Sequence, residues 1–360
     1  MSSQDLLKIA FIQVLDLFGI NALLRPRYAG LGVIFSLHRV VEPGTRTLLT
    51  GDVITTTLLD RILGYVRRCG WEIVDLGEAC RRIISREGGR FASFTLDDGY
   101  VNNLICGLPV FRKHQAPCTV FPCIGFLDRG QDPARIGRCI PRLRYGQFVV
   151  EYLLLRQDRV DFPHSDMPGV RRAESWEQKR RLLDALLAIE WRDPEGFTRS
   201  LDKWMAVQGV TLAEVLSTYF LDWAQARELA RDPLVTIGSH SLTHCRLSEL
   251  SAQEAENEMI VSRARLEREL DVPVRFLAYP FGGPLECGSR EFALAEKAGF
   301  TASVTTRLGN IFPEHRSNMQ ALPRVCLSIV PHAASLRFVK AGLYGSRNAL
   351  MNRFARVITE

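Results

Sequence analysis

The feature that most constrains the fold of this chain is a repeated alternation between short apolar runs and longer amphipathic stretches. Each apolar run has the length of a buried strand and ends in polar or turn residues. One amphipathic stretch begins at Ser251 with Glu254 three residues later, a spacing that is typical of a capped helix start. Strands that alternate with helices form parallel sheets, so the predicted fold class is α/β, with a sheet that is open or closed into a barrel. The predicted strands cover residues 32–38, 91–98, 118–123, 234–240, 274–280 and 301–306, and the clearest helices cover 56–70, 251–271 and 289–300.

The segment from about residue 128 to residue 232 departs from this alternation, because it is rich in helical patterns and contains most of the tryptophans. We interpret it as a helical insertion that covers the sheet rather than as a separate domain. The main domain is then predicted over residues 31–345. An amphipathic helix in residues 1–30 precedes this domain, and a basic helix in residues 346–360 follows it.

Composition excludes some classes of function. The formal net charge of +6 over 360 residues is modest and no helix-turn-helix or RNA-binding signature appears, so no nucleic-acid partner is expected. No uncharged run approaches the roughly 20 residues of a membrane span, and the N-terminus lacks the pattern of a secretory signal. Nine cysteines without a C-x-x-C pair suit a reducing compartment. We therefore predict a cytoplasmic protein, with its terminal helices as candidates for peripheral contact with a membrane.

Polar side chains gather where the predicted strands end. His38, Asp97, Asp98 and His240 each stand at the end of an apolar run, and a turn follows Tyr279. The carboxyl ends of parallel strands meet at one face of a sheet or barrel, where catalytic groups collect. The sequence therefore predicts one polar site at this face.

Two of these strand ends suggest a metal centre. Asp97 and Asp98 are adjacent like charges, and burying them is costly unless a cation compensates. His240 and His244 are four residues apart, so on a helical turn both imidazoles would reach one cation. Ser241 stands where the zincin motif has its glutamate base, so one carboxylate of the aspartate pair would be the third ligand and the other the base.

The stretches "TLDDGY", "SHSLTH" and "LAYPFGG", in this order, resemble the successive motifs of NodB-like polysaccharide deacetylases. The resemblance implies a distorted (β/α) barrel and a metal-dependent hydrolase that removes N-acetyl groups from an amino-sugar glycan, free or lipid-linked. By position it implies that Asp97 is the catalytic base. It also implies that Asp98, His240 and His244 bind a divalent metal ion, for which this ligand set favours Zn²⁺.

The sequence departs from the family pattern at two residues, the arginine that orients the base and the histidine that acts as general acid. Ala278 stands where the third motif has an arginine that orients the base, and Arg324 is the candidate replacement. The late histidine motif that supplies the general acid is matched only loosely by His332 in "IVPHAA". We prefer His38 as the acid, because a subgroup of the family ends its first strand with an active-site histidine.

The turn that begins at Tyr279 is predicted to bind the substrate, together with Pro280 and Phe281. A backbone N–H near Tyr279 would hold the oxyanion of the tetrahedral intermediate. The rings of Tyr279 and Phe281, with that of Tyr100, could stack on a sugar. Core packing is the commoner role of an aromatic side chain and is the competing interpretation for each of them.

Two other functions fit the same pattern. One is a hydrolase of this fold that acts on another non-peptide C–N bond, in a cyclic amide or ureide. The other is an inactive, glycan-binding homologue, with which the missing arginine at position 278 would be compatible. The two aspartates and the two histidines are all present, which favours an enzyme.

Overall fold

The computed structural model describes residues 19–49, 53–128, 145–160, 162–163, 166, 171–327, 335–346, 351–353 and 355–359. Most of the predicted helix in residues 1–30 and part of the predicted helix in residues 346–360 lie outside these ranges, as does His332. Within the described ranges, no helix is both long enough and apolar enough to cross a membrane.

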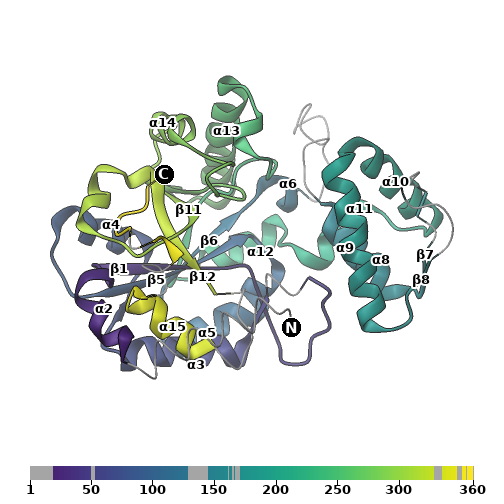
Figure 1. The fold of residues 1–360 in the computed structure, drawn as a ribbon. Helices are drawn as coiled ribbons and strands as arrows, with labels where there is room; N and C mark the ends of the chain where they lie inside the picture. The colour runs from purple at the N-terminus through teal and green to yellow at the C-terminus, as the bar shows by residue number, and fades with distance from the viewer. Residues whose placement is uncertain are drawn as a thin grey trace.

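The centre of the molecule is a ring of seven parallel strands, counted over the described residues (Figure 1). The ring strands follow one another in chain order from β1 to β12, as expected for right-handed βαβ units, and β12 pairs with β1. A bridge between Ser239 and Leu277 joins β9 to β10 and closes the ring. The predicted α/β barrel is therefore confirmed. The strands are β1 (Gly32–Leu37), β5 (Phe91–Asp98), β6 (Cys118–Pro122), β9 (Val235–Ile237), β10 (Phe276–Ala278), β11 (Ala302–Leu308) and β12 (Leu322–Cys326).

Three short strands of the barrel domain, as far as the structure describes it, lie outside the ring or on its margin. The two-residue β4 (Glu72–Ile73) pairs with the start of β5. The short β2 (Arg39–Val41) follows β1 after a single residue, His38, and pairs with β3 (Val53–Thr55). This arrangement fixes the chain on both sides of His38.

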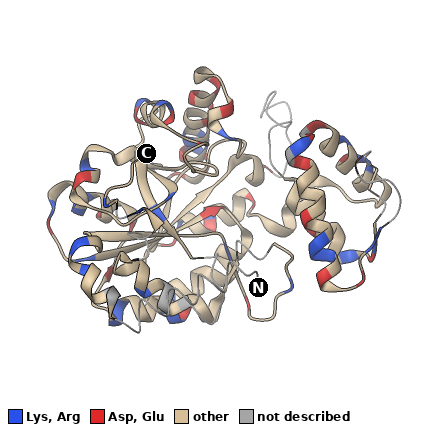
Figure 2. Cartoon of the chain, in the orientation of Figure 1, with Lys and Arg blue, Asp and Glu red and all other residues tan. Residues whose placement is uncertain are grey.

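Helices cover the outside of the ring, and Figure 2 shows more Lys, Arg, Asp and Glu on the helices than on the strands. In Figure 1, α3, α5 and α15 lie on one side of the barrel and α13 and α14 on the other. Helix α13 begins with the predicted capping box, in which Ser251 accepts from the backbone N–H of Glu254. These helices are α2 (Ile20–Tyr28), α3 (Thr56–Arg68), α4 (Leu76–Ser85), α5 (Leu108–Lys113), α6 (Ile124–Leu127), α12 (Trp223–Ala230), α13 (Ala252–Leu270), α14 (Ser289–Lys297) and α15 (Ser335–Leu343).

The two faces of β5 show how the strands divide the core. Phe94 and Leu96 belong to the apolar cluster between the strands and the surrounding helices. Thr95 and Asp97, which alternate with them, share a hydrogen-bonding partner on the other face. Because side chains alternate along a strand, one run of sequence serves both the helix-facing core and the polar interior that leads to the site.

Strand β12 was not predicted from the sequence. It has five residues and includes Pro323 and Arg324, which weaken the apolar signal of a buried strand. Two short 3₁₀ turns, Pro313–Ser317 and Met319–Ala321, precede it in place of a full helix. Arg324 is tolerated inside the barrel because its carboxylate partner, Asp97, also lies there.

The helical insertion has its own apolar cluster, which also includes Tyr100 and Phe126 from the barrel. In Figure 1 its four helices lie beside the barrel, at one end of the molecule. The helical pattern of residues 211–232, within the predicted insertion, is interrupted, because Phe220 is extended and Asp222 caps a new helix, α12. The insertion helices are α8 (Gly146–Arg156), α9 (Trp176–Arg192), α10 (Pro194–Val207) and α11 (Leu212–Tyr219), with a small hairpin of β7 (Arg159–Val160) and β8 (Arg171–Arg172).

A buried carboxylate joins this insertion to the barrel. Glu151 of α8 is fully buried and pairs with Arg39 of β2 at 3.2 Å. Its other oxygen accepts from the hydroxyl of Thr47 and the backbone N–H groups of Leu48 and Leu49, at 2.5, 2.5 and 3.0 Å. One side chain thus satisfies four donors from the segment that follows His38.

We expect Glu151→Ala to lower the free energy of unfolding by about 3–5 kcal/mol, because it leaves the Arg39 charge buried without its partner. Urea unfolding at equilibrium measures this change. The control is Glu177→Ala on α9, whose exposed pair with Arg181 should contribute no more than about 1 kcal/mol. Equal losses for the two variants would contradict the structural role of Glu151.

Candidate metal centre and active site

Three of the predicted ligands converge at the carboxyl end of the barrel. One ligand atom each from Asp98, His240 and His244 lies within 4.8 Å of the others. The Oδ1 atom of Asp98 lies 3.2 Å from Nε2 of His240 and 3.1 Å from Nε2 of His244. The side chains of Asp98 and His240 are almost completely buried, and that of His244 is 13% exposed.

The backbone at the end of β5 directs the two adjacent aspartates to different places. Asp98 has a φ of +70°, a left-handed conformation that turns its side chain away from the direction of Asp97. Gly99 follows with a φ of +76°, and a Cβ there would lie 2.8 Å from the side chain of Pro122. The "DDG" sequence therefore permits the turn that separates the two carboxylates. Asp97 faces the barrel interior, and Asp98 faces the histidines.

The two histidines lie on a loop, and the predicted helical turn is wrong. Residues 240–246 form no helix, and Ser241 and His244 both have left-handed φ values, of +62° and +53°. His240 continues from β9, and its backbone N–H donates to the carbonyl of Pro122. A tight loop therefore brings the rings together, with their centroids 4.8 Å apart.

The ring of His240 is oriented by a backbone contact. Its Nδ1 atom lies 2.8 Å from the carbonyl oxygen of Ala278, and because that oxygen can only accept, Nδ1 carries the proton. In the neutral ring Nε2 is then free of a proton, and this atom faces Asp98. This pattern, in which one ring nitrogen donates to the protein and the other is free, is the usual one for a metal-ligating histidine.

Burial and charge act in opposite directions on these groups. Burial by itself raises the pKa of Asp98, but the charge of His244 and contacts with both histidines hold that pKa well below its usual value. Burial lowers the pKa of His240, yet contact with Asp98 and the charge of Asp97 raise it overall. For His244 burial prevails, and its pKa is lowered. Asp98 is thus ionised at neutral pH, as a metal ligand must be.

The residues present fit a divalent cation. Oδ1 of Asp98 is buried and faces two ring nitrogens, but it accepts no hydrogen bond from either. A buried carboxylate oxygen without a hydrogen bond is costly, and a cation held between these three atoms would remove that cost. Two imidazoles and one carboxylate are also a ligand set that binds Zn²⁺ while leaving a position open.

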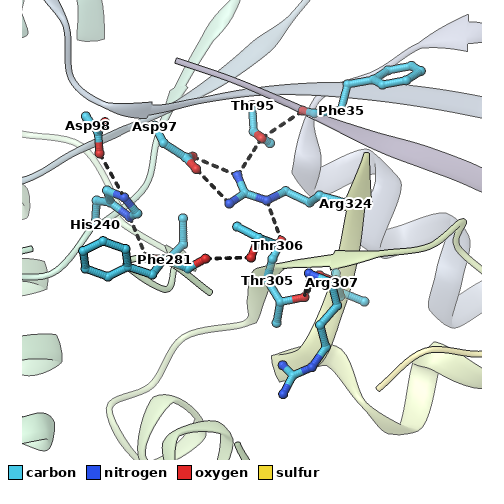
Figure 3. Close-up of polar contacts among 12 residues, drawn as sticks. Phe35, Thr95, Asp97, Asp98, His240, Phe281, Thr305, Thr306, Arg307 and Arg324 are labelled. Carbon is cyan, nitrogen blue, oxygen red and sulfur yellow. Dashed lines mark hydrogen bonds and ion pairs between the residues drawn. The ribbon is translucent and has the colours of Figure 1, made fainter. Parts of the chain in front are cut away.

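Asp97 is held by Arg324, the proposed replacement for the missing motif arginine (Figure 3). Nη1 and Nη2 of the guanidinium donate to the two carboxylate oxygens at 2.8 Å each, and the arginine side chain is 1% exposed. Nε donates to the carbonyl of Thr305 and Nη1 also to the hydroxyl of Thr95, so the fork has one orientation. Burial raises the pKa of Asp97, but the charges of Arg324, His240 and His38, together with the hydrogen bonds from Arg324, lower that pKa overall.

His38 lies at the same level of the barrel as Asp97. It follows Leu37, which pairs with Leu96 in the neighbouring strand. A positive charge on His38 contributes to lowering the pKa values of both Asp97 and Asp98. Its Nδ1 atom is buried and has no hydrogen-bonding partner among the described residues. The alternative acid, His332, lies outside those residues.

The turn after β10 differs from what the sequence predicted. The backbone N–H of Tyr279 donates to the carbonyl of Val304 and its hydroxyl to that of Gln320, so the buried tyrosine offers neither group to a substrate. Pro280 is also buried. Phe281 is half-buried with a φ of +61°, and its ring centroid lies 5.1 Å from that of His244.

Tyr100, the third predicted stacking residue, is 1% exposed and stacks on Phe220 of the insertion. Phe126, which was not predicted, packs between this aromatic group and the site, with its ring centroid 5.6 Å from that of His244. An apolar residue just after a strand gives no signal in the sequence that distinguishes it from any other core residue.

Comparison with known proteins agrees with this geometry. A family model described as polysaccharide deacetylase matches residues 198–303, which include both histidines and the turn after β10. The resemblance to the polysaccharide deacetylase family is confirmed. The prediction of a hydrolase that acts on carbon–nitrogen bonds is confirmed with it. No curated protein matches the sequence.

Several solved structures share the fold at low sequence identity. IcaB from Ammonifex degensii is 16% identical with a TM-score of 0.52, over 88% of this chain and 98% of that one. The deacetylase PplD from Streptococcus pyogenes, solved in complex with acetate, is 14% identical with a TM-score of 0.51, over 82% and 91%. BC0361, a polysaccharide deacetylase from Bacillus cereus, is 13% identical with a TM-score of 0.51, over 87% and 68%.

We expect Asp98→Ala to lower the affinity for Zn²⁺ by more than about 100-fold, because losing a ligand costs more than losing a hydrogen bond that supports one. Titration calorimetry on metal-free protein measures the affinity. The matched control is Asp97→Asn, one residue away, which should keep Zn²⁺ affinity close to that of the wild type. If the two variants exchanged behaviour, the two aspartates would have to exchange roles.

Proposed function

We propose that this chain is a metal-dependent deacetylase that removes N-acetyl groups from an amino sugar within a glycan. The observation that carries the proposal is the position of Asp97, which Arg324 holds in the barrel interior next to the Asp98–His240–His244 cluster. A hydrolytic site needs a base beside a position for water, and this arrangement provides both. The family resemblance supports the choice of an acetylated glycan.

Asp97 is the proposed general base. When bound, the cation would polarise the acetyl carbonyl and lower the pKa of water towards about 7. Asp97 accepts the proton of the attacking water, while Arg324 fixes its carboxylate in one orientation and keeps it ionised at neutral pH. The water oxygen then bonds to the carbonyl carbon.

His38 is the proposed general acid. As the carbon–nitrogen bond breaks, it gives a proton to the nitrogen, so that acetate and a free amine leave. Its position directly after β1, next to the strand that carries Asp97, supports this role. The half-buried ring of Phe281 beside His244 is the proposed stacking surface for the sugar. Lipid linkage of the glycan, peripheral membrane contact and a cytoplasmic location stay predictions.

The structure bears on one rival. An inactive homologue was suggested by Ala278, which leaves the base without the motif arginine. Arg324 makes the missing contact from β12 instead, with two hydrogen bonds to the carboxylate. This contact favours an active enzyme over a protein that only binds glycans.

We expect Arg324→Met to lower kcat/KM by about 10²–10⁴-fold near neutral pH, the usual contribution of a general base. Without the arginine the pKa of Asp97 rises, so the acid limb of the pH–rate profile should move to higher pH. Acetate release from N-acetylglucosamine oligomers measures both effects. Arg275→Met, at an exposed residue just before β10, is the control and should leave the profile unchanged. An unshifted acid limb in Arg324→Met would argue against Asp97 as the base.

We expect His38→Ala to lower kcat by about 10²–10⁴-fold with little change in Zn²⁺ affinity, because it removes a proton donor and no ligand. Substrates with better leaving groups, such as aryl acetates, need no protonation and should lose much less. A wild-type rate on the acetamide substrate would exclude His38 as the acid.

A further inference from the structure

The loop that carries the two histidines is held in an unfavourable backbone conformation. Ser241 and His244 both have positive φ values although both have a Cβ atom. Side chains disfavour this region, and such residues persist only where their surroundings hold them. The loop conformation therefore needs a support outside the loop itself.

Glu258 of α13 provides that support. Its side chain is buried, and Oε2 accepts from the backbone N–H groups of Leu242 and Thr243 at 2.9 Å each. Oε1 accepts from the hydroxyl of Thr243 at 2.8 Å. One carboxylate therefore binds both residues at the centre of the loop, in the way that successive N–H groups bind an anion.

The two histidines depend on this support to different degrees. His240 has contacts of its own, with Pro122 through its backbone and with Ala278 through its ring. The ring Nδ1 of His244 has no partner among the described residues, and its backbone N–H donates only within the loop, to Ser241. A relaxed loop would therefore displace His244 more than His240.

We propose that Glu258 is a positioning residue that holds the loop so that Nε2 of His244 faces Asp98. The inference rests on the proposed metal-dependent function, but it concerns the affinity of the cation site and not the reaction. Glu258 contacts neither a ligand nor a substrate. It acts through Leu242 and Thr243, which lie between the two histidines in the chain.

The test is the Co²⁺ affinity of metal-free protein, followed by the visible absorption of the bound ion. We expect Glu258→Ala to weaken binding about 10–100-fold, the usual cost of losing a group that orients a ligand, and to change the absorption spectrum. Glu258→Gln should restore most of the affinity, because its amide oxygen can accept both N–H groups and its NH₂ can donate to Thr243. Glu269→Ala, near the far end of α13, is the control and should bind as the wild type does.

A double-mutant cycle separates this role from general destabilisation. In a His244→Ala background the ligand that Glu258 positions is gone, so adding Glu258→Ala should weaken binding by a much smaller factor than in the wild type. If Glu258→Ala does not fold, Thr243→Val removes one of the three hydrogen bonds and should weaken binding roughly 2–10-fold.

If Glu258→Ala folds and binds Co²⁺ as tightly as the wild type, the inference is overturned. If Glu258→Ala does not fold, the same result in Thr243→Val would overturn it. An equal loss in both backgrounds of the cycle would also overturn it, because the effect would not then pass through His244. Wild-type protein that binds no Co²⁺ would contradict the proposed function itself, and the inference with it.

Discussion

The ion pair between Arg324 and Asp97 organises the interior of the barrel. It links β12 to β5 across β1. It lies between an apolar cluster, which includes Ile34, Phe121 and Leu322, and the polar residues at the carboxyl ends of the strands. Neither charge could be buried alone, because an isolated ion in this position would cost several kcal/mol. With both present, each hydrogen-bonding group of the pair has a partner, and Asp97 remains ionised next to a second carboxylate.

That second carboxylate can be so close because the backbone turns between the two aspartates. Asp98 adopts a left-handed conformation and belongs to a different environment, formed by two imidazoles. The two negative charges are thus balanced separately, Asp97 by a guanidinium within the protein and Asp98 by the histidines and the cation that they fit. In the proposed function, this separate balancing leaves Asp98 available to a metal ion while Asp97 stays ionised and able to accept a proton from water.

The sequence was most informative where one strong local signal decides the structure. Apolar runs that end in polar residues predicted six of the seven barrel strands, and the capping box predicted the start of α13. It was least informative where distant residues cooperate. The spacing of His240 and His244 suggested a helix, but the loop conformation depends on Glu258, whose distance in the chain hides the contact. Tyr279 appeared to belong to the site, yet its hydrogen bonds lie in the core.

The sequence named Arg324 as a candidate partner of Asp97, and the structure has hydrogen bonds between these two side chains, although the strand that carries Arg324 was not predicted. The reason is that charge complementarity can be argued from a list of residues, whereas a short strand containing proline and arginine has almost no pattern of its own. The arginine of the usual motif would come from position 278, where this chain has an alanine whose backbone carbonyl orients the ring of His240.

The closure of the barrel has a consequence for its dynamics. Strands β9 and β10 have three residues each, and Ser239 and Leu277 form the one bridge between them in the described part of the chain. Next to this bridge, the ring of His240 contacts the carbonyl of Ala278 and so also joins the end of β9 to β10. Separation of β9 from β10 would therefore displace His240, and a cation that fixed His240 would oppose this separation. Metal binding and protection of the Ser239 and Ala278 amides from hydrogen exchange are in this way thermodynamically linked.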